Sequence, residues 1–181
     1  MEQRKKTRPW VTFFSQTGSE IIEVSKHLNR WPDLIVTNKR PAHLRTINPE
    51  LEGKVFFVGN YPTIEELQPV LDLYENPLIT LHGWLRIMPP RICEKYEIYN
   101  SHPGLISDYE FLKGKDPQLR AYQAKLPYSG CVIHKVTPGV DEGEILSSAR
   151  VPIDGLELND VYKRLHEYSI LLWRLFLIDK V

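Results

Sequence analysis

The chain has 181 residues, a length that suits one domain with a sizeable core. Its 23 basic residues balance 23 acidic residues, so no net charge attracts a nucleic acid or an anionic membrane. The charged N-terminus has no apolar run behind it and no stretch is long enough to span a bilayer, so we expect neither a signal peptide nor a membrane anchor. The two cysteines, Cys93 and Cys131, lie far apart without metal-like spacing, which favours a reducing, cytoplasmic compartment and no disulfide framework.

The first half of the chain predicts buried strands that alternate with helices. Residues 1–9 are expected to form a basic tail and residues 10–181 a single domain. A helix is expected from Ser19, as its N-cap, to Leu28, and another at 63–74 that a Thr63-x-x-Glu66 capping box opens. Short apolar runs predict strands at 10–14, 33–37, 54–58 and 77–81. This alternation is typical of an α/β, Rossmann-like fold with a mostly parallel sheet flanked by helices.

The second half predicts more strands and a final long helix. A strand is expected at 96–100, and two others at 131–137 and 144–152. The connection at 104–129 is long, with a helix near 117–125, and such a loop beside a site often acts as a substrate lid. An amphipathic helix is expected at 156–179, either continuous or broken near Ser169.

Polar residues suited to acyl transfer stand at the ends of these strands. Asn100 and His102 lie two residues apart on an extended backbone, so both project from one face and can act on one carbonyl. Asp141 follows the strand at 131–137, and a carboxylate that arrives from a separate loop can orient an imidazole and raise its basicity. An amide, an imidazole and a carboxylate together can move an acyl group onto an amine.

These motifs resemble those of the folate-dependent formyltransferase family, which is marked by N-x-H-P and by later G-x-x-x-H and D-x-G segments. The motifs stand here at 100–103 and 130–143, and residues 81–88 look like the strand and loop that hold folate in the family. The resemblance implies an enzyme of one-carbon metabolism and purine biosynthesis that transfers the formyl group of 10-formyltetrahydrofolate to a small-molecule amine. Glycinamide ribonucleotide is one candidate acceptor. No metal, nucleic acid or membrane is expected to take part, and a monomer and a homodimer are both open.

The resemblance also implies a role for each site residue. Asn100 would donate to the oxyanion, His102 would polarise the carbonyl or carry a proton, and Asp141 would steer proton transfer. His134 matches a family position inside a strand and is expected to support the site. Folate is expected to contact residues of two segments, namely His82, Leu85, Arg86, Ile87 and Met88 of the first and Val140 and Glu142 of the second.

The acceptor side departs from the family pattern. The family's phosphate-binding loop corresponds to Thr17, Gly18 and Ser19, whose backbone N–H groups could hold a phosphate. One glycine of that loop is missing, and Glu20 replaces an asparagine, so its charge would repel a phosphate. Glu167 on the last helix would receive the amine of the acceptor, as a family glutamate does.

Three alternatives remain open at the level of sequence. An amino-sugar nucleotide N-formyltransferase would use the same residues on another amine, and a formyltetrahydrofolate hydrolase would use them on water. A non-catalytic folate-binding module would use none of them. Such a module need not keep Asn100, His102 and Asp141 together, so the intact set counts against it. A tRNA substrate is not expected, because the sequence shows no C-terminal extension of the kind that holds tRNA in some family members.

Overall fold

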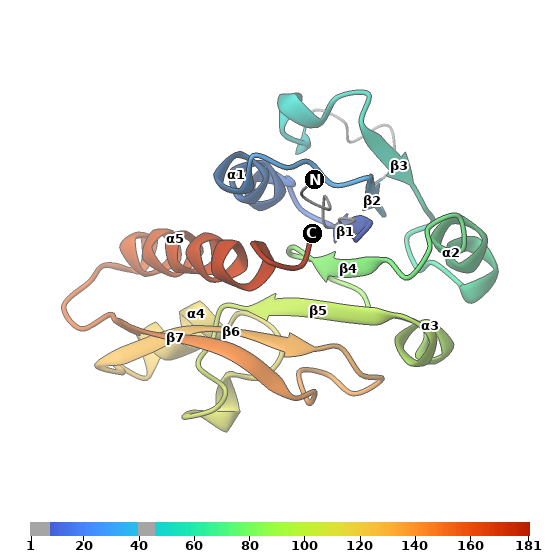
Figure 1. Cartoon of the computed structure of the whole chain (residues 1–181). Coiled ribbons are helices and arrows are strands. Elements are labelled where there is room, and N and C mark those ends of the chain that lie inside the picture. The colour runs from blue at the N-terminus through green and yellow to red at the C-terminus, as the bar shows by residue number, and fades with distance from the viewer. Residues whose placement is uncertain (1–7, 40–45) are drawn as a thin grey trace.

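The computed structural model describes residues 8–39 and 46–181, so most of the predicted basic tail lies outside the described residues. Its centre is a seven-stranded sheet of order β3-β2-β1-β4-β5-β6-β7 (Figure 1). The parallel strands are β1 (Trp10–Phe14), β2 (Leu34–Thr37), β3 (Val55–Phe57), β4 (Leu78–Leu81) and β5 (Glu97–His102). The antiparallel strands are β6 (Tyr128–Lys135) and β7 (Ile145–Pro152). The predicted mostly parallel α/β sheet is confirmed.

Helices cover both faces of this sheet. In Figure 1, α1 and α5 lie together on one side, while α2 and α3 lie on the other. The helices are α1 (Ser19–Leu28), α2 (Ile64–Leu71), α3 (Pro90–Lys95), α4 (Pro117–Gln123) and α5 (Leu158–Leu177), with short 3-10 turns η2 (Pro49–Leu51) and η3 (Glu110–Leu112). Among the described residues, no helix is both long and apolar enough to cross a membrane.

Two predicted helix caps are wrong, although α1 begins at Ser19 and Thr63 is the N-cap residue of α2 as expected. Gly18, not Ser19, is the N-cap of α1, with a left-handed φ of 76°. A Cβ at position 18 would lie 2.4 Å from Leu51 Cδ1, so this turn requires glycine. The Thr63 side chain makes no cap hydrogen bond, and Glu66 Oε1 instead accepts from the Gly59 N–H at 2.5 Å. The missing capping box reflects a longer-range partner for Glu66.

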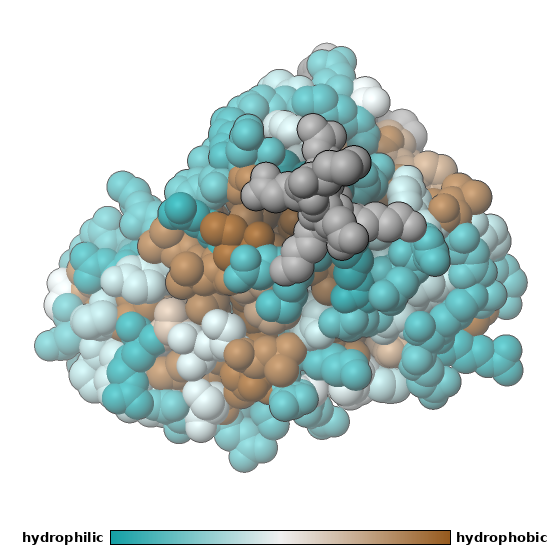
Figure 2. Space-filling model, in the orientation of Figure 1, coloured by the Kyte–Doolittle hydropathy of each residue, from teal (hydrophilic) through white to brown (hydrophobic). Residues whose placement is uncertain are grey.

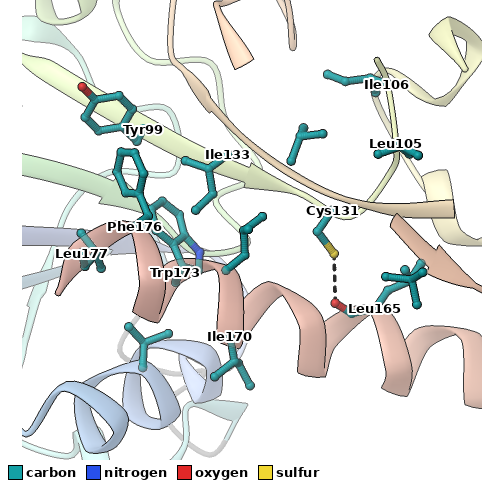
Figure 3. Packing of buried hydrophobic residues seen from close by; sticks show 14 of the residues in the cluster. Tyr99, Leu105, Ile106, Cys131, Ile133, Leu165, Ile170, Trp173, Phe176 and Leu177 are labelled. Carbon is teal, nitrogen blue, oxygen red and sulfur yellow. Dashed lines mark hydrogen bonds between the residues drawn. The ribbon is translucent and has the colours of Figure 1, made fainter. Parts of the chain in front are cut away.

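The last helix, α5, runs without a break through Ser169 and packs against β5 and β6. Figure 3 shows Ile133 and Cys131 of β6 facing the helix residues Trp173 and Leu165, and the Cys131 thiol donates to the Leu165 carbonyl at 3.0 Å. Each fully buried side chain of this size contributes about 1.5–3 kcal/mol. The packing holds α5 directly behind the strand that carries Asn100 and His102.

The surface in Figure 2 is mostly hydrophilic, with apolar residues gathered around α5. That helix exposes Leu171, Leu175 and Ile178 to solvent. Apolar residues on both the buried and the exposed side of α5 blur its periodicity, which explains why the sequence alone did not give the orientation of its polar residues.

Candidate active site

A cavity of about 760 Å³ opens at the carboxyl ends of β4 and β5. Ligands of open α/β sheets bind beyond these ends, so the position suits a functional site. Ser15, directly after β1, holds the loop that forms one wall of the cavity. Its hydroxyl accepts from the Leu85 N–H at 3.0 Å, and its N–H donates to the Gly83 carbonyl at 3.1 Å. The lining comes from five stretches: Gln16; residues 81 and 83–88; residues 100–103; residues 114–118; and residues 134, 136, 137 and 139–141.

The structure brings Asn100, His102 and Asp141 together in this cavity. His102 Nδ1 lies 3.2 Å from Asp141 Oδ2, and His134 Nε2 lies 3.4 Å from Asp141 Oδ1. Asn100 is paired with His134 across β5 and β6, and its Nδ2 lies 3.3 Å from His134 Nε2. One carboxylate thus contacts two imidazoles, and the second imidazole contacts the amide.

The environment of Asp141 keeps its carboxylate ionised. Burial raises the pKa of Asp141, but the hydrogen bond from His134, the charge of His102 and the Gly114 N–H outweigh it and hold the pKa below its usual range. The Gly114 N–H donates to Asp141 Oδ2 at 2.8 Å, and the Asp141 backbone has a left-handed φ of 52°. The turn and the long connection together aim this carboxylate at the cavity.

Two opposing effects act on the protonation of His102. Burial lowers its pKa, while the Asp141 charge and the Leu112 carbonyl raise it, and the net shift is downward. His102 Nε2 lies 2.8 Å from the Leu112 oxygen. Because the Leu112 carbonyl and the Asp141 carboxylate can only accept, both contacts are satisfied only when both ring nitrogens carry a hydrogen. A side chain balanced in this way suits the uptake and release of a proton.

The long connection between β5 and β6 contacts both of these residues. Its Leu112 carbonyl meets His102, and its Gly114 N–H meets Asp141. The Arg120 guanidinium holds this segment by donating to the Leu112 carbonyl at 3.2 Å and to the Lys113 carbonyl at 2.7 Å. The segment predicted as a lid therefore lies on the site, and its movement stays a prediction.

Most of the residues predicted to bind folate line the cavity. Leu85, Ile87 and Val140 expose 58%, 67% and 53% of their surface, so each can give apolar area to a flat ring. Met88 is buried in the wall. Arg86 also lines it, but its guanidinium donates to the Asn60 side-chain oxygen at 2.7 Å and to the Asn60 carbonyl at 2.9 Å.

Two residues that were predicted to contact folate do not line the cavity, and these contacts stay predictions. The His82 side chain is fully buried and bonds to Thr80 and Glu20, so it does not line the cavity. Glu142 is not part of the lining either, although its neighbour Asp141 is. The sequence motif suggested both because each is adjacent to a residue that does reach the cavity.

The predicted acceptor residues lie outside the cavity lining as well. The Thr17 hydroxyl lies 3.0 Å from the Ser19 hydroxyl, which also accepts from Asn48 Nδ2 at 3.2 Å, and Gly18 is buried. Glu167 is exposed on α5, whereas Ser169, two residues later, is buried and faces α1. The 100° rotation per helical residue puts positions 167 and 169 on different sides of the helix. Glu167 does not line the cavity, and its contact with the acceptor amine stays a prediction.

The sequence reasoning missed several lining residues. Gln16 and Lys115 carry no motif signal, and the fold brings them to one cavity, while Trp84 lies within the segment at 81–88 that resembles the folate-holding loop but was not singled out. Ser101 lies inside the Asn100–Pro103 motif, and its place between two polar residues could have drawn attention to it. Among the described residues, no group of three or more His, Cys, Asp or Glu side chains could hold a metal ion.

Comparisons with known proteins show the family of the chain. Residues 34–172 match the formyl transferase family. The chain is 26% identical over 166 residues to phosphoribosylglycinamide formyltransferase of Dictyostelium discoideum, which covers 79% of this chain and 81% of that protein. It is 29% identical over 147 residues to the protein of the same name from Haemophilus influenzae, which covers 75% and 68% of the two chains.

Solved structures share the fold. The structure of phosphoribosylglycinamide formyltransferase from Anaplasma phagocytophilum matches with a TM-score of 0.82 at 23% identity, over 96% of this chain and 86% of that chain. Glycinamide ribonucleotide transformylase 1 from Geobacillus kaustophilus matches with a TM-score of 0.79 at 22% identity, over 96% and 98% of the two chains.

Proposed function

The chain belongs to the formyl transferase family and is an enzyme that uses 10-formyltetrahydrofolate as formyl donor, and on this premise we propose that its acceptor is the amine of phosphoribosylglycinamide. The observation that carries the proposal is the cluster of Asn100, His102 and Asp141 in one cavity, with His102 Nδ1 3.2 Å from Asp141 Oδ2. The names of the two relatives above supply the acceptor.

The cluster suits each step of this transfer. The amine nitrogen forms a bond to the formyl carbon, and the carbonyl electron pair moves onto oxygen. The Asn100 amide donates an N–H to that oxygen, which lowers the barrier by roughly 2.7–4 kcal/mol by analogy with other oxyanion donors. The intermediate then breaks its bond to the folate nitrogen. His102, oriented by Asp141, carries the proton that the acceptor nitrogen loses to the folate nitrogen that leaves.

The two sides of the cavity suit two different molecules. The apolar side chains of Leu85, Ile87 and Val140 offer a surface for the pterin ring of the donor. Gln16, Gly83 and Ser101 line the part nearest the end of β1 and the helices α1 and α5, which leaves that part for the acceptor.

One observation favours a second candidate acceptor. Thr17, Gly18 and Ser19 do not line the cavity, and the Glu20 carboxylate stands in the first turn of α1, where a phosphate would otherwise be attracted. An amine without a phosphate at that position, such as an amino sugar, meets no such repulsion.

Product release from 10-formyltetrahydrofolate tests these proposals. The protein is incubated with the formyl donor alone, with phosphoribosylglycinamide, and with a panel of amino sugars. Release that requires phosphoribosylglycinamide supports the first candidate, and release that requires an amino sugar supports the second. Release that no amine accelerates identifies a hydrolase, and donor binding without release in any mixture identifies a binding module. Either result contradicts the proposed transfer.

A further inference from the structure

A chain of hydrogen bonds joins the end of β5 to α5 and α1, and the transfer described above uses none of it. Ser101 Oγ lies 2.7 Å from Ser169 Oγ on α5. The Ser169 hydroxyl donates to Glu20 Oε1 on α1 at 2.5 Å. The other carboxylate oxygen, Glu20 Oε2, lies 2.9 Å from His82 Nδ1. A carboxylate and an imidazole are thus linked to a residue of the cavity wall.

The far end of this chain sets the direction of its hydrogens. The Trp10 indole can only donate, and its Nε1 donates to Thr80 Oγ1 at 2.9 Å. Thr80 Oγ1 lies 2.9 Å from His82 Nε2. Every group is satisfied when the Thr80 hydroxyl donates to His82 Nε2 and His82 Nδ1–H donates to Glu20. The hydrogens on this arm therefore point toward the carboxylate.

The same argument fixes the arm that reaches the cavity. A carboxylate only accepts, so the single hydrogen of Ser169 goes to Glu20. The oxygen of Ser169 then accepts from Ser101, which commits the only hydroxyl hydrogen of Ser101. Toward the cavity, the Ser101 oxygen can only accept a hydrogen bond. An amine N–H is the complementary donor.

The charge of Glu20 is maintained by its surroundings. Burial raises the pKa of Glu20, but the hydrogen bonds from His82 and Ser169 outweigh it and hold the pKa below its usual range. Burial and the charge of the Glu20 carboxylate raise the pKa of the Cys131 thiol on β6. The Glu20 carboxylate therefore stays ionised and gives a negative potential at Ser101, to which Ser169 connects it.

Ser101 is placed to meet an acceptor rather than the folate. It stands between Asn100 and His102, so its side chain projects from the opposite face of β5, toward α5. It also lines the cavity. An amine bound at Ser101 is one residue along the strand from the amide that meets the developing oxyanion.

We propose that the Ser101 oxygen accepts an N–H of the acceptor amine. Ser169 and Glu20 are positioning residues that keep this oxygen turned toward the amine. The Glu20 carboxylate also stabilises the positive charge that develops on the amine nitrogen during transfer. The inference rests on the proposed transfer to an amine, and it assigns to Glu20 on α1 the task predicted for Glu167 on α5. It holds for an acceptor with or without a phosphate.

Packing alone does not account for this arrangement. Well-packed apolar residues in place of a buried charged pair are often neutral or stabilising, so Glu20 and His82 are not needed merely to hold α1 against α5. A purely structural carboxylate would also be satisfied by His82 and Ser169, without the further bond from Ser169 to the cavity residue Ser101.

The test compares Ser101→Ala, Ser101→Thr and Glu20→Gln with the unaltered protein in steady-state assays with 10-formyltetrahydrofolate and each amine that supports transfer. We expect Ser101→Ala and Glu20→Gln to lower kcat/KM for the amine at least tenfold, with KM for 10-formyltetrahydrofolate within twofold. Ser101→Thr keeps a hydroxyl and should retain most of the activity. Ser25→Ala and Glu23→Gln, on α1 but outside the chain of hydrogen bonds, serve as matched controls and should leave both constants unchanged.

Two results overturn the inference. One is a kcat/KM for the amine within twofold of the unaltered protein in Ser101→Ala. The other is an equal loss for the amine and the folate in Ser101→Ala, which would indicate a general structural defect. Should Glu20→Gln fail to fold, Ser101→Ala and Ser101→Thr decide the question, because they leave the bonds among Glu20, Ser169 and His82 in place. Failure of the unaltered protein to transfer to any amine would instead contradict the proposed function itself.

Discussion

Asp141→Asn is the sharpest test of the catalytic cluster, because it removes one charge and almost no volume. In the structure the carboxylate contacts His102 at 3.2 Å and His134 at 3.4 Å, and its exposed fraction is only 11%. The amide that replaces it cannot attract an imidazolium, and its NH2 group is a wrong partner for a ring N–H. We expect the substitution to leave the fold intact and to remove the orientation of His102.

The structure sets the size of the expected loss. A hydrogen bond to a charged group contributes about 1.5–3 kcal/mol. Losing one such contact in the transition state lowers the rate about 10- to 150-fold, and the second contact, to His134, can raise the loss further. We therefore expect kcat to fall by about two orders of magnitude, while the dissociation constant of the folate changes little.

The assay is steady-state formyl transfer together with folate binding and thermal unfolding of the same protein samples. Asp154→Asn, in an exposed turn, is the matched control and should behave as the unaltered protein. If Asp141→Asn kept kcat within threefold, or if folate affinity fell as much as kcat, the role assigned to Asp141 would be refuted.

Further predictions concern acidity, packing and backbone conformation. Burial lowers the pKa of His102, so the acidic limb of the pH profile of kcat/KM should lie below about pH 6.5. Because the charge of Asp141 raises the pKa of His102, this limb should move to still lower pH in Asp141→Asn. A move of the limb to higher pH would contradict the assignment. Trp173→Ala should lower the free energy of unfolding in urea by about 3–5 kcal/mol, because Trp173 is fully buried against β6. Gly18→Ala should destabilise by about 1–2 kcal/mol or more, because its φ is 76° and its Cβ would meet Leu51 Cδ1 at 2.4 Å; unchanged melting would show that the turn can relax.

The sequence predicted those features that depend on local patterns. The apolar runs of β1, β2 and β4 and the alternation of Asn100 and His102 are local, and the structure has them where the patterns indicated. Asp141 was found through its motif, although the long connection after β5, the strand β6 and a turn separate it from His102 in the chain. Local order and a recognisable spacing were sufficient for these residues.

The placement of other predicted site residues depends on partners that are distant in the chain. His82 was expected in the pocket, but its partner Glu20 lies 62 positions earlier and draws it into the interior. Glu167 was named because a glutamate occupies this region in the family, but α5 carries apolar residues on its exposed side as well, so the sequence did not settle the orientation of this helix. Both differences concern pairing between elements, which composition and periodicity do not encode.

The pair of Asp141 and His102 and the pair of Glu20 and His82 lie on different sides of β5. We therefore expect the two pairs to affect different steps of the reaction. In the proposed mechanism, Asp141 and His102 move the proton that reaches the folate nitrogen, so they would be needed whether an amine or water attacks. Glu20 is linked to the site through Ser169 and Ser101, on the side toward α5. Slow release of formate from the donor without an amine should therefore fall in Asp141→Asn and stay unchanged in Ser101→Ala, while transfer to the amine falls in both. Equal loss of formate release in the two variants would show that both substitutions disturb the same step. The separate roles assigned to the two sides of β5 would then be wrong.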